Sequence, residues 1–102
     1  MDGFDIDEID DVIHGRVRLG VMAYLASANA AEFNELKRRL QVTDGNLSVH
    51  LRKLEDAGYV EVEKSFVGRK PLTRLKLTPG GRDAFLAYLD AIGRLVGEVR
   101  SA

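Results

Sequence analysis

The chain has 102 residues, 45% of them hydrophobic and 30% charged, with a formal net charge of −1. These values fit a single soluble globular domain, and no stretch approaches the roughly 18 consecutive apolar residues that a membrane span needs. The absence of cysteine excludes disulfides, thiolate metal sites and a cysteine nucleophile, and the acidic N-terminus is unlike a secretory signal, so we expect a cytoplasmic protein.

Charge is segregated along the chain. Residues 33–76 carry ten basic and six acidic side chains, a net +4, whereas residues 1–32 carry two basic and seven acidic ones, a net −5. A positive segment of this kind is typical of a nucleic-acid interface, even in a chain that is almost neutral as a whole.

Residues 1–14 predict an N-terminal helix that Asp5 can cap. Its apolar positions recur at spacings of 3 and 4 residues, at Ile6, Ile9 and Ile13. A helix this short is unstable alone, so the stripe needs cover from another element.

Two residues of this segment, Asp10 and His14, lie four positions apart and could share a metal ion, with Asp7 and Asp11 nearby. A solvated acidic face explains the same residues, and no further ligand cluster is visible in the sequence. We therefore predict neither a metal site nor a cofactor.

A second helix is predicted from about Arg16 to Ser27, after an interruption at Gly15. Its core face would be formed by Leu19, Met22, Ala23 and Ala26. Residues 27–31 then read as a connection.

Two short helices joined by a tight turn are predicted over residues 33–58. The first, FNELKRRL, sets Phe33, Leu36 and Leu40 against the core. The second is capped by Thr43, stopped by Gly58 and buries Leu47, Leu51 and Leu54. This is the helix-turn-helix arrangement, in which the first helix lies across the DNA backbone and the second enters the major groove.

The exposed sides of both helices carry the candidate DNA contacts. In the first helix, Lys37, Arg38 and Arg39 are candidates for phosphate binding. On its exposed side the second helix has mostly short hydrogen-bonding or cationic side chains, which suit contacts with base edges and phosphates. Arg52 lies at the margin of that side. These candidates are Thr43, Gly45, Asn46, Ser48, Val49, His50 and Lys53. The alternative is that both are ordinary amphipathic helices with a solvated charged side.

Beyond Gly58, alternation with a period of two predicts a β-hairpin over residues 59–78. Val60, Val62 and Phe66 are expected to pack inward or near the sheet edge, and Pro71 to open the return strand. The turn formed by Gly68, Arg69 and Lys70 gives a basic tip, where Arg69 and Lys70 could reach a phosphate or a narrow minor groove.

The last helix is predicted from Pro79 to Val99, with Thr78 as its N-cap and proline at its first position. Two adjacent apolar stripes make its apolar side too wide for one neighbour, which favours a subunit interface. The expected dimer interface comprises Ile6, Ile9, Ile13, Leu89, Ile92, Val96 and Val99. Gly93 and Gly97 could admit another backbone, or could simply weaken the helix near its end.

With these elements in order, the chain resembles a winged-helix transcriptional regulator related to the MarR and ArsR families. The likeness is carried by HGRVRLGVMAYLA (14–26), FNELKRRLQVTDGNLSVHLRKLEDAGYVEVEK (33–64), GRKPLTRLKLTPGG (68–81) and the last helix. The resemblance implies an α+β fold, mainly α with a small β-hairpin, that binds a pseudo-palindromic operator in double-stranded DNA as a homodimer and usually represses transcription. Metal-sensing relatives use cysteine thiolates or histidine-carboxylate clusters, and an effector would have to bind between the dimerisation helices or at the interface.

The implied layout is one winged-helix domain over residues 1–102. It comprises an N-terminal dimerisation helix (1–14), the helix-turn-helix (33–58), the wing (59–78) and a C-terminal dimerisation helix (79–100). The alternative is a protein–protein interaction module without DNA binding, because Asp44, Glu61 and Glu63 would repel phosphate if they faced a duplex. An enzyme is not expected, since the two histidines, His14 and His50, have no recognisable catalytic context and no glycine-rich phosphate loop occurs.

Overall fold

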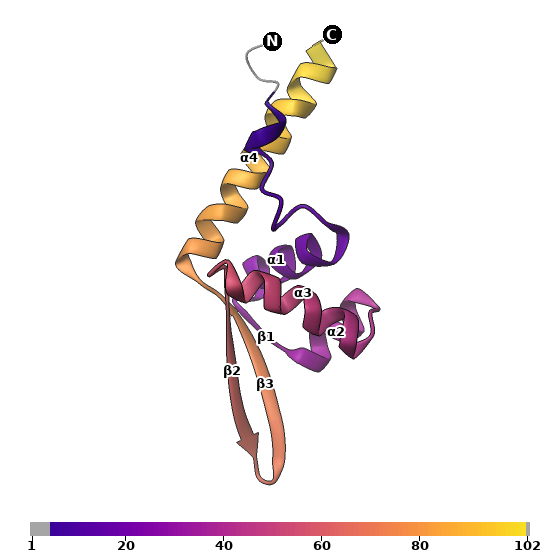
Figure 1. The fold of residues 1–102 in the computed structure, drawn as a ribbon, viewed down its shortest axis with the longest axis vertical. Helices are drawn as coiled ribbons and strands as arrows, with labels where there is room; N and C mark the ends of the chain where they lie inside the picture. The colour runs from indigo at the N-terminus through magenta and orange to yellow at the C-terminus, as the bar shows by residue number, and fades with distance from the viewer. Residues whose placement is uncertain (1–4, 102) are drawn as a thin grey trace.

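A computed structural model of the chain describes residues 5–101. Within that range, four α-helices and three β-strands follow a single 3-10 turn, and the strands form one antiparallel sheet in the order β1-β3-β2 (Figure 1). The elements are the 3-10 turn Ile6–Glu8, α1 Arg16–Ala28, β1 Ala30–Glu32, α2 Phe33–Leu40, α3 Asp44–Asp56, β2 Val60–Val67, β3 Lys70–Leu77 and α4 Pro79–Ser101. This is the winged-helix arrangement that the sequence predicted.

The core is centred on α1, which contacts α2, α3, α4 and β3. Its largest fully buried side chains come from α1, α2, α3, β3 and the segment before α1: Ile13, Val21, Met22, Leu25, Leu36, Leu47, Leu54 and Leu75. The predicted buried stripe of α3 is confirmed, since Leu47, Leu51 and Leu54 all face this core. Burial of these leucines fixes which side of α3 is left for solvent or a ligand.

The buried side of α1 differs from the prediction. Of the four expected core residues only Met22 is buried, while Ala23 is exposed. The core instead takes Val17, Val21 and Leu25. These larger side chains remove more apolar surface from water than the alanines do, so they determine the orientation of the helix.

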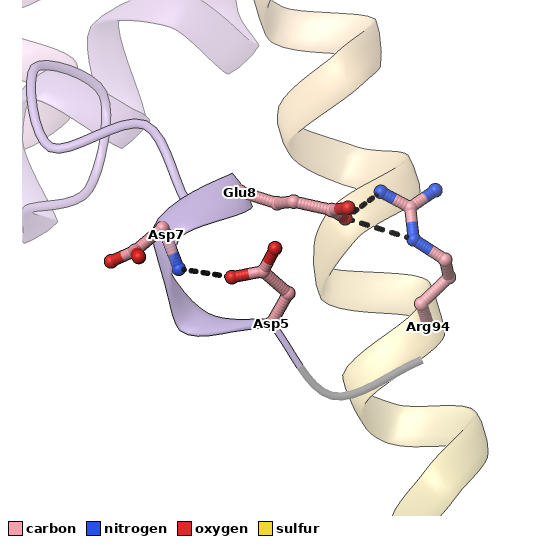
Figure 2. Close-up of polar contacts among 4 residues, drawn as sticks. All are labelled: Asp5, Asp7, Glu8 and Arg94. Atoms are coloured by element: carbon pink, nitrogen blue, oxygen red, sulfur yellow. Dashed lines mark hydrogen bonds and ion pairs between the residues drawn. The ribbon is translucent and has the colours of Figure 1, made fainter. Parts of the chain in front are cut away.

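The predicted N-terminal helix is wrong over the described part of residues 1–14, and residues 1–4 lie outside the described residues. Asp5 does act as a cap, because its carboxylate accepts from the Asp7 N–H at 3.0 Å, but only one 3-10 turn follows (Figure 2). Ile9 is already extended, and Asp10 Oδ1 accepts from the N–H groups of Val12 and Ile13. That local turn competes with helix formation for the same backbone donors.

The N-terminal segment lies beside α4 and is held there by an ion pair between Glu8 and Arg94, with Arg94 Nε 3.1 Å from the carboxylate (Figures 1 and 2). Ile9 and Ile13 are only 8% and 0% exposed within the single chain. The expectation that this stripe lacks cover within one chain is therefore wrong for both. Ile6 alone keeps a largely exposed side chain.

The chain from 27 to 31 is more than a connection, because Ala30–Glu32 forms β1 and pairs with β3. Asn29, at φ +68°, ends α1 in the left-handed half of the backbone map and redirects the chain into the sheet. A three-residue strand is too short to show alternation, so the sequence carried no signal for it.

The wing is formed by β2 and β3, whose register runs from Val60 opposite Leu77 to Val67 opposite Lys70. Lys70 is thus a strand residue and the turn is Gly68-Arg69, with Gly68 at φ +62°. Val60 is buried as predicted, whereas Phe66 is 73% exposed, so of the two expected positions it takes the one near the sheet edge, on the edge strand β2, and does not pack inward. Phe66 pairs with Pro71 at the end of the hairpin that projects beyond the helices (Figure 1).

The junction between the wing and α4 matches the predicted cap. Thr78 Oγ1 accepts from the Gly81 N–H at 2.8 Å and donates to the Gly58 carbonyl at 2.6 Å. Gly81 has no room for a side chain, because a Cβ there would lie 2.0 Å from the carbonyl oxygen of Tyr59. The end of α3 and the start of α4 are therefore fixed against each other.

The first half of α4 packs on the core through Phe85, Tyr88 and Ala91. Its second half extends away from the body at the opposite end of the molecule from the wing tip, and the chain measures 58 × 25 × 21 Å (Figure 1). Exposed apolar side chains of α4 are Leu86, Leu89, Val96 and Val99. None of the helices over residues 5–101 is long and apolar enough to cross a membrane.

Candidate nucleic-acid interface

The exposed side of α3 carries most of the predicted DNA contacts. Thr43 caps the helix, because its Oγ1 accepts a hydrogen bond from the Asn46 N–H at 3.1 Å. The next candidates, Gly45, Asn46, Ser48, Val49 and Lys53, are all exposed. Val49 is 57% exposed, and an uncovered valine on such a helix can contact a thymine methyl group. The contact roles of these residues remain predictions.

His50 lies at the flank of this side and is half-buried. Its Nδ1 is 2.9 Å from Nη1 of Arg18, which reaches across from the first turn of α1. Burial, the Arg18 charge and the Lys53 charge together lower the pKa of His50 below its ordinary value of 6.5. This shift favours the neutral imidazole.

Sequence reasoning missed Arg18, although one signal was available. A cation in the first turn of a helix opposes the helix dipole, and the first turn of α1 contains no acidic residue. Such a placement suggests that the guanidinium is used by something outside its own helix. Here it is the imidazole of a residue 32 positions later.

The three cations of α2 are not equivalent. Lys37 Nζ lies 2.7 Å from Asp44 Oδ1, so this charge is offset at the start of α3. Arg39 sits over the ring of Tyr24, with its Cζ 5.7 Å from the ring centroid. Arg38 is exposed. Of the three, Arg38 is therefore the most available to a phosphate.

A Tyr24–Glu35 hydrogen bond supports the same helix. The Tyr24 hydroxyl donates to the Glu35 carboxylate. This bond is the largest of the effects that lower the pKa of Glu35. The Glu32 N–H and the charges of Arg38 and Arg39 act in the same direction, and burial opposes them. Glu35 also completes a capping box with Glu32 at the start of α2.

A groove of about 640 Å³ separates α3 from the wing. Its lining includes two cations: Arg52, which the sequence places at the margin of the exposed side of α3, and Lys64, for which no role is predicted. It also includes the carboxylates of Asp44, Glu55 and Asp56. A phosphate strand in this groove would meet both signs of charge. Asp44 is already paired with Lys37, and Glu63 on β2 lies 3.5 Å from Lys76, which lessens their repulsion.

Arg69 and Lys70 are exposed at the tip of the wing. The hairpin carries them to the end of the molecule, away from α3 (Figure 1). The structure therefore separates the predicted contacts into two groups, and a duplex lying along α3 would meet the wing tip at a different groove or phosphate.

The acidic N-terminal residues are used within the fold. Asp10 Oδ2 accepts from the Tyr59 hydroxyl at 2.5 Å, which raises the pKa of Tyr59 to about 12, with burial and the Asp10 charge contributing less. His14 Nδ1 is hydrogen-bonded to the Tyr88 hydroxyl at 2.8 Å. Among residues 5–101 no group of three or more potential ligand side chains is placed to hold a metal ion.

Comparison with known proteins agrees with this geometry. Residues 17–96 match the family described as winged helix DNA-binding domain. The chain is 42% identical over 84 residues to the uncharacterized protein MJ0432 of Methanocaldococcus jannaschii, covering 82% of this chain and 91% of that protein.

Two solved structures extend the comparison. A transcriptional regulator homologue from Pyrococcus horikoshii OT3 has a TM-score of 0.87 at 27% identity, covering 97% of this chain and 98% of that one. A transcriptional regulator assigned to the MarR family from Enterococcus faecalis V583 has a TM-score of 0.69 at 28% identity, covering 88% and 83%. Both are described as transcriptional regulators or homologues of one, in agreement with the sequence prediction of a regulator. The chain therefore belongs to the family of winged-helix DNA-binding domains and has the fold of a transcriptional regulator.

Proposed function

We propose that this winged-helix regulator represses transcription by binding, as a homodimer, a pseudo-palindromic operator in double-stranded DNA. The observation that carries the proposal is the exposed side of α3. The helix is capped by Thr43, anchored by three buried leucines, and presents hydrogen-bonding and cationic side chains to solvent. The basic wing tip supplies a second contact with the same duplex.

The proposed dimer interface is the second half of α4, where Val96 and Val99 are exposed. A shallow hollow of about 320 Å³ lies beside them, lined by Ile92, Leu95, Val96, Val99 and Arg100. On the glycine side of the helix, a Cβ at Gly93 or Gly97 would meet nothing within 4 Å, so a second backbone could approach there. Leu89 and Ile6 are also exposed, whereas Ile9 and Ile13 are already covered by their own chain.

Two-fold symmetry through α4 would present two copies of α3 to one face of a duplex. Half-sites read by such a pair are separated by about 34 Å, one turn of B-DNA. The operator would then be pseudo-palindromic because the reading elements are symmetric. Binding across a promoter would exclude polymerase, which is the basis of the repressor assignment.

The test is duplex binding across a salt series. Purified protein should bind DNA from its own promoter region with an affinity that falls steeply as salt rises, because several condensed counterions are released from the phosphates. Each phosphate contact contributes about −0.9 to the slope of log K against log salt. Transcription from that promoter in vitro should fall as protein is added.

The same measurement distinguishes DNA binding from the alternative function, a protein–protein interaction module. If no promoter-derived duplex binds at low salt, the interaction-module function should replace this one, and the carboxylates of the α3–wing groove would be the feature that favours it. Binding with a flat salt dependence would argue against phosphate contacts by the cationic residues.

A further inference from the structure

Arg18 is hydrogen-bonded to one ring nitrogen of His50, and this contact links the first turn of α1 to the flank of the exposed side of α3. Arg18 Nη1 lies 2.9 Å from His50 Nδ1. The same guanidinium donates from Nε to the carbonyl of Val12 at 2.5 Å and from Nη2 to the carbonyl of Asp11 at 3.4 Å. The planar group is thus fixed by two backbone carbonyls while it holds the imidazole.

The chemistry of the guanidinium determines the state of the ring. Arginine stays protonated in proteins and has five N–H donors and no acceptor. Nδ1 of His50 must therefore accept this hydrogen bond and carries no hydrogen. An imidazole with a bare Nδ1 is neutral and has its hydrogen on Nε2.

We propose that Arg18 is a positioning residue for base recognition, because it fixes His50 as a neutral imidazole that can only donate, through Nε2, to an acceptor on a base edge. This inference rests on the proposed DNA-binding function. In the major groove the acceptors are N7 of either purine, O6 of guanine and O4 of thymine, whereas cytosine offers a donor. We therefore expect guanine, which has two acceptors, to be preferred opposite His50, adenine and thymine to be accepted less well, and cytosine to be rejected.

The charges around the ring support this state. The charged groups that act on His50 are Arg18, from α1, and Lys53, from its own helix, and both are positive. An imidazolium would be repelled by each of them and would also lose its bond to Arg18, since both nitrogens would then be donors. Burial of the ring acts in the same direction.

The first experiment needs no DNA. Long-range proton–nitrogen NMR correlations on the uniformly labelled protein report which ring nitrogen carries the hydrogen, and the chain has two histidines, which His50→Gln would assign. At neutral pH His50 should show a bare Nδ1 and a protonated Nε2. A hydrogen on Nδ1, or a doubly protonated ring, would overturn the proposal whatever the protein binds.

The second experiment measures base preference with a matched pair of variants. Arg18→Met keeps the aliphatic stem and removes the donors, while Arg16→Met removes an equal charge from an exposed position in the same turn. Wild type and the Arg18→Met, Arg16→Met and His50→Ala variants are each used to select bound sequences from a pool of randomised duplexes. Arg18→Met and His50→Ala should reduce the preference at the same base pair by roughly fivefold or more, the lower end of a mismatch effect, and Arg16→Met should not.

The double variant Arg18→Met/His50→Ala should lose no more preference at that base pair than either single variant, because the two residues act through one hydrogen bond. Equal weakening on all duplexes with the preference intact would instead make Arg18 a phosphate contact and overturn the proposal. Failure of the wild type to bind any duplex would refute the proposed function itself. If Arg18→Met does not fold, the wild-type NMR result decides.

Discussion

At the scale of single residues, we expect the exposed side chains of α3 to contact base edges and those of the wing tip to contact phosphates or the minor groove. Asn46 lies in the first turns of α3, and its amide can donate and accept at a base edge. Arg69 lies at the wing tip and suits a phosphate or the minor groove. Base contacts determine sequence preference, whereas phosphate contacts add affinity to every duplex.

Asn46→Ala should therefore cost about 1–3 kcal/mol on the best duplex and less on variants of it, whereas Arg69→Ala should weaken all duplexes alike and reduce the salt slope by about 1. Titration of an operator and several single-base variants measures both effects. Equal losses on every duplex from Asn46→Ala would mean that this amide does not read a base.

The lowered pKa of His50 gives a prediction for stability. Because the unfolded ring titrates near its ordinary value of about 6.5 and the folded ring below it, the unfolded state binds more protons in between. The contribution to stability is fully present above about pH 6.5 and is lost as pH falls through the lowered folded value.

Chemical denaturation of wild type and His50→Gln at pH 5.5 and pH 7.5 tests this prediction, with both pH values on the order of a unit either side of the ordinary pKa. The variant should lose less stability than the wild type on acidification over this interval, because it lacks the titrating ring. An identical loss in both proteins would show that His50 is not coupled to folding. Only the difference between the two pH values matters, so the loss of the Arg18 bond itself does not affect the comparison.

The sequence could identify the exposed residues of α3 but not the partners of its side chains within the fold. Caps and leucine spacing are local signals, so they were sufficient to orient the helix and to list Asn46, Val49 and Lys53 as exposed. The Arg18–His50 contact joins residues 32 positions apart, and the Lys37–Asp44 pair depends on the angle between two helices. Such contacts exist only once the tertiary arrangement is set, which periodicity does not report.

At the scale of elements, predictions succeeded where the signal lay inside the element. Residues 33–40 form α2 with the predicted bounds, and α3 lies between its predicted capping residues. The two failures differ, because β1 carried no signal of its own, whereas the helical spacing and cap of the N-terminal segment were overridden by tertiary contacts. β1 is defined by its pairing with β3, and the N-terminal segment is defined by its contacts with α4 and the core. Phe66 alternates correctly along β2 but lies beyond the helices that would cover it.

The junction between the wing and α4 is a contact between elements that leaves no room for an added side chain at Gly81. A Cβ at Gly81 would fall 2.0 Å from the backbone oxygen of Tyr59, so either α4 or the chain at Tyr59 would have to move. At Gly80 the nearest atom to a Cβ would be 3.8 Å away, an ordinary contact. The two neighbours in the first turn of α4 therefore form a matched pair.

Gly81→Ala should destabilise the protein by about 3 kcal/mol or more, since the clash is with backbone and no side chain can rotate away. Gly80→Ala should change stability by less than about 1 kcal/mol, with a small gain expected from helix propensity. Thermal or denaturant unfolding of both variants provides the comparison. A Gly81→Ala protein as stable as Gly80→Ala would mean that the approach of Tyr59 to α4 is looser than described.

At the scale of the whole molecule, the two ends of the long axis have different proposed partners: the wing tip contacts DNA and the second half of α4 contacts another copy of the chain. Replacement of Val96 and Val99 by glutamate tests the second role with little risk to the fold, because both side chains are exposed in the single chain. Four carboxylates would meet across a two-fold interface and would have to lose water there.

The double variant should become monomeric at micromolar concentration and lose DNA affinity by at least roughly tenfold, or about 1.4 kcal/mol, because each α3 would then bind a half-site alone. Ala87→Glu is the control: it is exposed on α4 and lies about 180° around the helix from Val96, so dimerisation and binding should be unaffected. Sedimentation and duplex titration measure the two quantities. A wild type that sediments as a monomer would refute the homodimer itself. A double variant that dimerises and binds normally would place the subunit contact outside the second half of α4, and since Ile9 and Ile13 are covered within the chain, Leu86 would be the next apolar side chain to test.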